Sequence, residues 1–68
     1  MKYFDANGVE ITVNAAAEIT IACGAVKHGK VIQLNDEQVT LRCEVTGQNP
    51  DGILYGGEHN KVRIINSA

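Results

Sequence analysis

The chain has 68 residues, with six Lys and Arg against eight Asp and Glu, and a formal net charge of -2. A chain this short forms one small domain, near the lower size at which a single hydrophobic core holds a fold. It lacks the basic excess of a dedicated nucleic-acid binder, although a local basic stripe is compatible with it. No apolar run approaches the roughly 20 residues of a membrane span, and no leader-like segment is present, so we expect a soluble, cytoplasmic protein.

The core has to be built almost without aromatic residues. Apolar residues make up 44% of the sequence, but there is no Trp, one Phe and two Tyr. The core therefore has to come from Val, Ile, Leu and Ala, and the many β-branched residues favour strands. Two cysteines are too few for a disulfide framework, so unpaired thiols are the default.

The first 13 residues read as two strand-like runs around the turn-forming sequence DANG, which predicts a hairpin over residues 1–13. A two-residue turn puts Asp5 opposite Glu10. A four-residue loop puts Phe4 opposite Val9 and separates those like charges. We expect the longer loop.

The next segment, NAAAEITIACG, begins either with a helical turn capped by Asn14 or directly with a strand. Ile19, Ile21 and Cys23 alternate with other residues, and a glycine ends the run. The alternation predicts a strand at residues 18–23 whose core face carries these three side chains.

Residues 28–45, HGKVIQLNDEQVTLRCEV, read as two alternating arms around a polar turn. A two-residue and a four-residue loop set the same register, with Leu34 opposite Val39 and Ile32 opposite Leu41. On the second arm one face is expected in the core and the other in solvent. The core face carries Val39, Leu41, Cys43 and Val45, and the solvent face carries Thr40, Arg42 and Glu44.

The last third of the chain predicts another hairpin and a final strand. Residues 49–52, NPDG, suit a type I turn followed by a left-handed residue, and the chain returns through residues 53–55. After a glycine-rich segment, the run KVRII at residues 61–65 puts Val62 and Ile64 on the core face and its two basic residues on the solvent face.

Together these elements predict one all-β domain over residues 1–68, of about six or seven short strands, with an N-terminal hairpin at 1–13 and a barrel-like core at 18–65. Five strands with tight turns are best closed into a small barrel, because closure removes exposed edges.

The sequences EITIACGAVKHGKVIQLNDEQVTLRCEV and KVRII resemble the KOW-type members of the SH3-like barrels. In these, a strand, a glycine-bearing loop, a hairpin and two short strands follow one another. Gly29 matches the glycine before the second strand, whereas the loop AVKH lacks the aromatic residue that such modules often use against bases.

Neither metal binding nor catalysis is expected. The soft ligands are Cys23, His28, Cys43 and His59. Their spacings differ from those of structural zinc sites, and the cysteines fall on predicted core faces while the histidines fall in loops, so we expect no metal and no cofactor. A Cys23–Cys43 bridge remains an alternative, because both thiols could face one core. Ser67 lies beside the C-terminus and the thiols are predicted to be buried, which leaves no nucleophile.

The remaining sequence indication of function is a set of basic residues. Positive charges cluster on segments that a barrel could bring together, and one tyrosine offers a platform on which a base could stack. The candidate binding residues are Lys27, Lys30, Arg42, Tyr55, Lys61 and Arg63. The plainer interpretation is ordinary solvation of strand faces, with cross-strand partners such as Glu44.

We expect a non-catalytic interaction module that binds another protein or itself, because so short a chain has little room for both a core and an enclosed pocket. Self-association through an exposed edge would also relieve the thin core. This hypothesis predicts an apolar patch with outward residues such as Ile65 or Tyr3. One alternative is an RNA- or DNA-binding module that uses the basic stripe, and another is an accessory or structural protein of a phage or mobile element.

Overall fold

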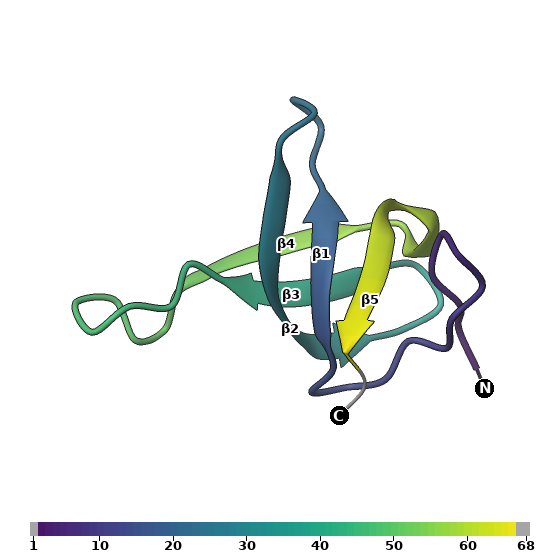
Figure 1. Cartoon of the computed structure of the whole chain (residues 1–68), viewed down its shortest axis with the longest axis horizontal. Helices are drawn as coiled ribbons and strands as arrows, with labels where there is room; N and C mark the ends of the chain where they lie inside the picture. Colours follow the sequence, from purple (N-terminus) through teal and green to yellow (C-terminus); the bar gives the residue numbers. More distant parts are fainter. Residues whose placement is uncertain (1, 67–68) are drawn as a thin grey trace.

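A computed structural model describes residues 2–66 and confirms an all-β protein with five antiparallel strands in one sheet (Figure 1). Ser67 and the first residue of the predicted N-terminal hairpin lie outside the described residues. The elements in chain order are β1 (Ala16–Thr20), β2 (Val26–Leu34), β3 (Val39–Cys43), β4 (Ile53–Gly57), the 3-10 helix η1 (His59–Lys61) and β5 (Val62–Asn66). In space the strand order is β4-β3-β2-β1-β5. Over the described residues the sheet is not closed into a barrel, because β4 and β5 remain at its two edges.

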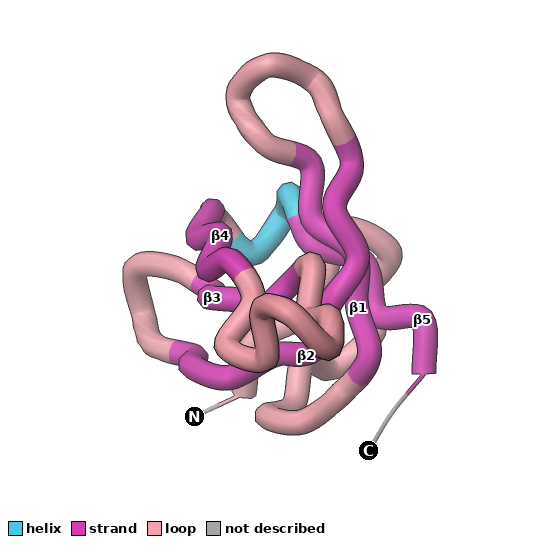
Figure 2. Tube along the Cα trace, turned by 90° about the vertical axis from the view of Figure 1, so that its left-hand side faces the viewer, coloured by secondary structure: helices cyan, strands magenta, loops and turns pink. Residues whose placement is uncertain are grey.

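The longest strand, β2, gives the sheet its shape. It pairs with β1 over its first half and with β3 over its second half. A register shift between Val31 and Gln33 marks an irregularity of the kind that bends a strand. As a result β3 and β4 cross behind β1 and β5 at a steep angle, and a side view shows the strands curling around a central space (Figure 1 and Figure 2).

The hydrophobic core fills the space between the two halves of this curled sheet. Its members are small or branched apolar side chains, as the composition predicts: Ile11, Ala17, Ile19, Val31, Val39, Leu41, Cys43 and Val62. Full burial of each Val, Leu or Ile side chain contributes about 1.5–3 kcal/mol. All except Ile11 come from β1, β2, β3 and β5, so these four strands hold one another in place through one cluster.

Two glycines are required by the local backbone. A Cβ atom at Gly29 would clash with the carbonyl oxygen of Arg42 and lie 2.6 Å from the Cys43 sulfur, so glycine allows β2 and β3 to approach. Gly52 has a φ of 63°, and its N–H donates to the carbonyl of Asn49 at 3.1 Å. The predicted turn at residues 49–52 and its left-handed last residue are therefore confirmed.

The N-terminal segment is a loop closed by one bridge, not a hairpin of two strands. The isolated bridge joins Phe4 to Glu10, so the predicted pairing of Phe4 with Val9 is wrong. The reason lies in Asp5, whose backbone N–H donates to the Val9 carbonyl at 2.8 Å while its side chain turns inward. The described chain therefore has five strands where the sequence suggested six or seven.

The strand predicted at residues 18–23 begins and ends earlier, as β1. Ile19 is buried as predicted, but Ile21 is half-buried and Cys23 is exposed. The chain already turns after Ile21, whose N–H donates to the carbonyl of Ala25 at 2.9 Å. The alternative of a helical turn through the alanines is also wrong, since two of them belong to β1.

The register of the β2–β3 hairpin is partly as predicted. Leu34 stands opposite Val39, which confirms the turn end of the register. Further along, Val31 stands opposite Leu41 in place of the predicted Ile32. The irregularity between residues 31 and 33 causes this change, because one extra residue in a strand moves every later partner by one position.

The inward face of β3 ends sooner than the alternation predicts. Leu41 and Cys43 are buried, but Val45 is 55% exposed. β3 ends at Cys43, and Glu44 has a left-handed φ of 56° that turns the following backbone away from the pleat. Thr40, which the alternation predicts in solvent, is only 9% exposed. It lies beside the register shift of β2, where the alternation of inward and outward side chains changes.

The C-terminal strand follows the prediction. Val62 is buried and Ile64 is half-buried, while Arg63 between them is exposed. Lys61, predicted on the same strand face as Arg63, belongs instead to η1. Across residues 2–66, no helix has the length and apolar character that crossing a bilayer requires.

Candidate functional site

The six candidate binding residues lie in three places and do not form one stripe. Lys30, Arg42 and Arg63 share the outward face of the sheet. Lys27 and Tyr55 form a second group around Glu44. The third place is η1, which carries Lys61.

Strand register explains why three basic residues share the outward face. Lys30 is paired with Arg42, and His28, two residues earlier on the same strand, is paired with Glu18. Glu18 is paired in turn with Arg63. Paired residues and residues two positions apart lie on the same side of a sheet, so all five side chains point outward. Glu18 is half-buried and the other four are exposed.

At the β5 end of this face the positive charge is compensated. Glu18 lies between two partners, with Oε1 3.6 Å from Nη1 of Arg63 and Oε2 3.2 Å from Nε2 of His28. Such exposed pairs contribute at most about 1 kcal/mol to stability. Ordinary strand-face solvation therefore describes Arg63 well, with Glu18 as its partner.

At the β3 end of the same face, two positive charges stand directly opposite each other without compensation. Lys30 and Arg42 are paired across β2 and β3, and within residues 2–66 neither has a carboxylate at salt-bridge distance. Like charges placed directly opposite on a sheet are destabilising by up to about 1 kcal/mol. These two side chains line a groove of about 430 Å³, whose other lining residues are Asn14, Ile32, Val45 and Pro50.

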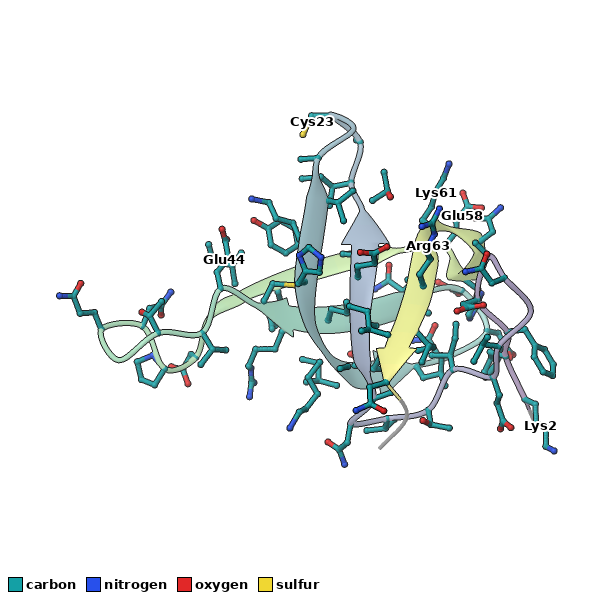
Figure 3. The ribbon with its side chains drawn as sticks, viewed as in Figure 1. Lys2, Cys23, Glu44, Glu58, Lys61 and Arg63 are labelled. Carbon is teal, nitrogen blue, oxygen red and sulfur yellow. The ribbon has the colours of Figure 1, made fainter. Side chains whose placement is uncertain are left out.

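Lys61 approaches Arg63 at the corner between η1 and β5. Both side chains line a second groove of about 310 Å³ together with Glu18, Thr20 and others. Lys61 also lines a neighbouring groove with Glu58, and Figure 3 labels these side chains at this corner. This groove therefore combines both signs of charge.

Lys27 and Tyr55 lie on the opposite side of the sheet from the outward basic face. Lys27 is paired with the buried Ile19, and Tyr55 with the buried Leu41, so both project at the rim of the core. Glu44 joins them: its Oε1 is 3.4 Å from the Lys27 ammonium, and its Oε2 accepts a 3.0 Å hydrogen bond from the Tyr55 hydroxyl. The Lys27 nitrogen also lies 5.7 Å from the centroid of the Tyr55 ring.

This contact favours the protonated form of both groups. The hydrogen bond to Glu44 raises the pKa of the Tyr55 hydroxyl and the pKa of the Lys27 ammonium above their ordinary values. Both groups keep their protons at neutral pH. The Tyr55 ring has a cation above it and a carboxylate at its hydroxyl, and it does not share a face with Arg42.

The two thiols are separate and differ in environment. Cys23 is exposed in the turn between β1 and β2, as Figure 3 shows, whereas Cys43 is buried. The prediction that both are buried is wrong for Cys23, and the alternative of a bridge between them is excluded because both are unpaired. Burial raises the pKa of the Cys43 thiol, which makes it unreactive.

His28, expected in a loop, lies in β2. Over residues 2–66 no three His, Cys, Asp or Glu side chains are grouped so as to hold a metal ion.

A buried carboxylate, Asp5, is the feature that sequence reasoning missed. It is 6% exposed. Its Oδ1 accepts from the backbone N–H groups of Asn7 and Val9, both at 2.8 Å, and its Oδ2 accepts from the N–H of Ile64 at 2.7 Å. Burial alone would raise the pKa of Asp5, but the backbone N–H donors together outweigh it, so the pKa lies below its ordinary value. The sequence DANG signals the local bonds, but nothing in it signals the bond to β5.

Asp5 and its neighbour cover one edge of the sheet. Along β5, the carbonyl of Val62 accepts from the N–H of Ala6 at 3.0 Å, and the N–H of Ile64 donates to Asp5. Figure 1 shows this N-terminal loop running beside β5. The other edge strand, β4, pairs only with β3 over the described residues.

The β4 edge also carries exposed apolar side chains. Ile53 is 45% and Leu54 55% exposed, and Val45 lies nearby at the base of the same hairpin arm. Ile65 on β5 is exposed as predicted, at 58%. Tyr3 does not form part of an outward patch. Its ring stacks on His59 with the centroids 4.8 Å apart, and its hydroxyl donates to Asp36.

Comparison of the chain with protein-family models, with curated proteins and with solved structures finds no match. Among the surface features of residues 2–66 that can make contacts are the backbone of β4, the apolar side chains beside it, and the pair of Lys30 and Arg42. These features suit the binding of a ligand, and none of them brings a nucleophile to an acid or base.

Proposed function

We propose that the chain is a non-catalytic interaction module that binds another protein, or a second copy of itself, through the edge of β4. The observation that carries this proposal is the difference between the two sheet edges: the N-terminal loop bonds to the backbone of β5, whereas within residues 2–66 no backbone group bonds to the outer edge of β4, although its last residue, Gly57, lies beside Ile19 of β1. An uncovered edge presents unpaired N–H and C=O groups, which are a template for an added strand.

The composition of β4 supports this use of the edge. Proteins protect exposed edges with charged residues, proline or bulges. The segment Ile53–Gly57 contains none of these, and its pairing with β3 is regular along its whole length. Its exposed Ile53 and Leu54 would gain about 25 cal/mol for each Å² of apolar surface that a partner covers.

A second copy of the chain suits this edge as well as another protein does. Antiparallel pairing of two β4 strands around Tyr55 would place Ile53 opposite Gly57 and Leu54 opposite Gly56. No charged residue lies in this segment, so such pairing brings no like charges together. The contact would use the same surface on both chains, as two-fold symmetric dimers do.

The proposal is of a non-catalytic module because neither thiol within residues 2–66 has an activating partner. Cys43 is buried with a raised pKa, and Cys23 lies in an exposed turn. The paired carboxylates of the β2–β3 turn are exposed, and one of them, Asp36, accepts the hydroxyl of Tyr3. A general acid needs a raised pKa in a protected site.

Binding of RNA or DNA is the second candidate, favoured by the shared outward face of Lys30, Arg42 and Arg63. It predicts affinity that falls steeply with salt and is lost when Arg42 and Arg63 are replaced. It has less support than protein binding, because Arg63 is paired with Glu18 and Tyr55 points to the other side of the sheet.

The resemblance to KOW-type SH3-like barrels is part of the proposal. It is supported by the order of features from β1 to β5: a strand, a turn that contains Gly24, the β2–β3 hairpin and two short strands. Gly29 also lies where the backbone of β3 comes too close for a Cβ atom on β2. The open sheet differs from a closed barrel, and in it β4 pairs with β3 alone over the described residues.

Peptide selection tests the proposal without a known partner. Random peptides displayed on phage would be selected on the wild-type protein and then tested against Leu54→Lys and Ile65→Lys. The two residues are equally exposed apolar side chains on opposite edge strands, at 55% and 58%. A lysine on an edge strand opposes strand addition. We expect binding to be lost with Leu54→Lys and kept with Ile65→Lys. Equal effects of the two variants, or binding that survives Leu54→Lys, would contradict the proposal.

A further inference from the structure

The groove between Lys30 and Arg42 has features that the β4 edge alone does not explain. Strand register holds the two cations directly opposite each other. The basic groups Lys27, His28 and Arg63 each have a carboxylate partner, at 3.4, 3.2 and 3.6 Å respectively. Lys30 and Arg42 have none within residues 2–66, as is also true of Lys2 and Lys61, but only Lys30 and Arg42 are paired with each other across two strands. The fold therefore keeps an exposed like-charge pair that a bound anion would compensate.

The walls of the groove show what kind of anion fits. Ile32 on β2 and Val45 and Pro50 on the β3–β4 arm supply apolar surface beside the two cations, and Asn14 adds an amide. A small inorganic anion would make no use of the apolar walls. A carboxylate side chain that is flanked by apolar residues would use both.

We propose that the Lys30–Arg42 groove binds a Glu or Asp side chain of an extended, partly apolar segment of the protein partner. This inference rests on the proposed function and specifies the partner's chemistry. The guanidinium of Arg42 can hold a carboxylate through two parallel hydrogen bonds, and the ammonium of Lys30 adds a point charge on the same side.

The position of the groove agrees with strand addition at β4. Leu54 of β4 is paired with Arg42 of β3, so both side chains point outward. A strand added to β4 would lie about 10 Å from β3, since neighbouring strands are spaced by about 4.7–4.9 Å. Arg42 and a Glu on the outward face of the added strand are long enough to meet across Leu54, and Lys30, one strand farther away, adds its charge from the other side of Arg42.

An acidic protein segment fits better than a nucleic acid. The chain carries a net charge of -2, which repels a polyanion, and only two uncompensated cations meet at this groove. Nucleic-acid binding at low salt draws on many phosphate contacts, whereas one carboxylate needs only this pair.

Two matched peptides test the inference: one of alternating Val and Glu, and its counterpart of alternating Val and Gln, both with blocked termini. In an added strand, alternate residues share a face, so all Glu side chains would point to the same side. Binding is followed by NMR shifts of the backbone amides of the full chain. We expect the Glu peptide to bind about tenfold more tightly than the Gln peptide, as one charge-assisted contact implies.

Single substitutions show which residues cause the preference for the Glu peptide. With Arg42→Gln the preference for the Glu peptide should disappear, whereas with Arg63→Gln, on the same face but already paired with Glu18, it should remain. Arg42→Gln also removes the like-charge pair, so its melting temperature should be no lower than that of the wild type. The Glu peptide should raise the melting temperature of the wild type more than that of this variant.

The outcomes separate this inference from the proposed function. If both peptides shift the amides of β4 equally, the acidic preference is wrong and the β4 edge still binds protein. If neither peptide shifts the amide signals of β4, both proposals fail. The acidic-segment inference is overturned if Arg63→Gln abolishes the preference for the Glu peptide as fully as Arg42→Gln does. It is also overturned if oligothymidine shifts the amide signals of Lys30 and Arg42 and the Glu peptide does not.

Discussion

Asp5 and Ile64 are 59 positions apart in the chain and are joined by a 2.7 Å hydrogen bond, from the backbone N–H of Ile64 to the Asp5 carboxylate. With the bond from Ala6 to Val62, it closes one edge of the sheet. The opposite edge, β4, has no such cover within residues 2–66. The sheet therefore has one edge bonded to the N-terminal loop and one edge, β4, whose outer backbone groups have no hydrogen-bond partner within residues 2–66.

Replacing Asp5 should destabilise the protein more than replacing an exposed carboxylate. Asp5→Asn removes the charge that accepts three backbone N–H groups, and we expect a loss of about 1–3 kcal/mol in the free energy of unfolding. Asp51→Asn, in an exposed turn, is the matched control and should change stability by less than about 0.5 kcal/mol. Urea unfolding measures both. Equal, small effects would mean that the Asp5 contacts contribute nothing.

The Asp5 contribution should depend on pH. The pKa of Asp5 is lower in the folded chain than its ordinary value of 3.8, so the unfolded chain binds a proton first as the pH falls. The stabilisation is fully present above that ordinary value and is lost as the pH falls through the folded-state pKa. Unfolding free energies of the wild type and Asp5→Asn, measured from neutral to acidic pH, should differ at neutral pH and converge in acid. A difference that is constant with pH would show that the charge is irrelevant.

The inward face of β3 can be tested by a pair of truncations. Leu41 is fully buried and Val45 is 55% exposed, although the sequence alternation assigns both to the core. Leu41→Ala should cost about 2–4 kcal/mol, and Val45→Ala less than about 0.5 kcal/mol. Thermal or urea unfolding gives both values. A large loss of unfolding free energy for Val45→Ala would show that Val45 belongs to the core.

Thiol labelling should distinguish the two cysteines. Cys23 is exposed, whereas Cys43 is buried and its thiol has a pKa raised by that burial. A thiol reagent should therefore label one cysteine in the native protein at once and both only after unfolding. Cys23→Ser should abolish the fast phase and Cys43→Ser should not. Rapid labelling of both thiols in the native wild type would contradict this description of the core.

The sequence predicts the fold where the signals are local. The NPDG turn, the register of Leu34 with Val39 and the burial of Leu41 all follow from neighbouring residues, and all are confirmed. The errors come from backbone features that leave the alternation of apolar residues unchanged. A shift within β2 replaces Ile32 by Val31 opposite Leu41, and an early turn exposes Cys23.

The candidate site could be predicted only in part for the same reason. Alternation correctly places Arg42 and Arg63 on exposed strand positions, but only strand order and register show that Lys30 is opposite Arg42 and that Glu18 stands beside Arg63. The pairing of Asp5 with Ile64 and the uncovered β4 edge are tertiary features. No sequence pattern within a few residues encodes them.

Amide hydrogen exchange of the complex is the most direct test of the β4 edge. Exchange would be measured by NMR on the full chain, alone and with a peptide selected on the wild-type protein. We expect the peptide to slow exchange at alternate amides of Ile53–Gly57, because an added strand would bond to the N–H groups that point away from β3. The amides of Val62–Asn66 should not change, because the N-terminal loop already covers that edge. Unchanged exchange along β4, or protection gained along β5 in its place, would contradict the proposal that β4 is the binding edge.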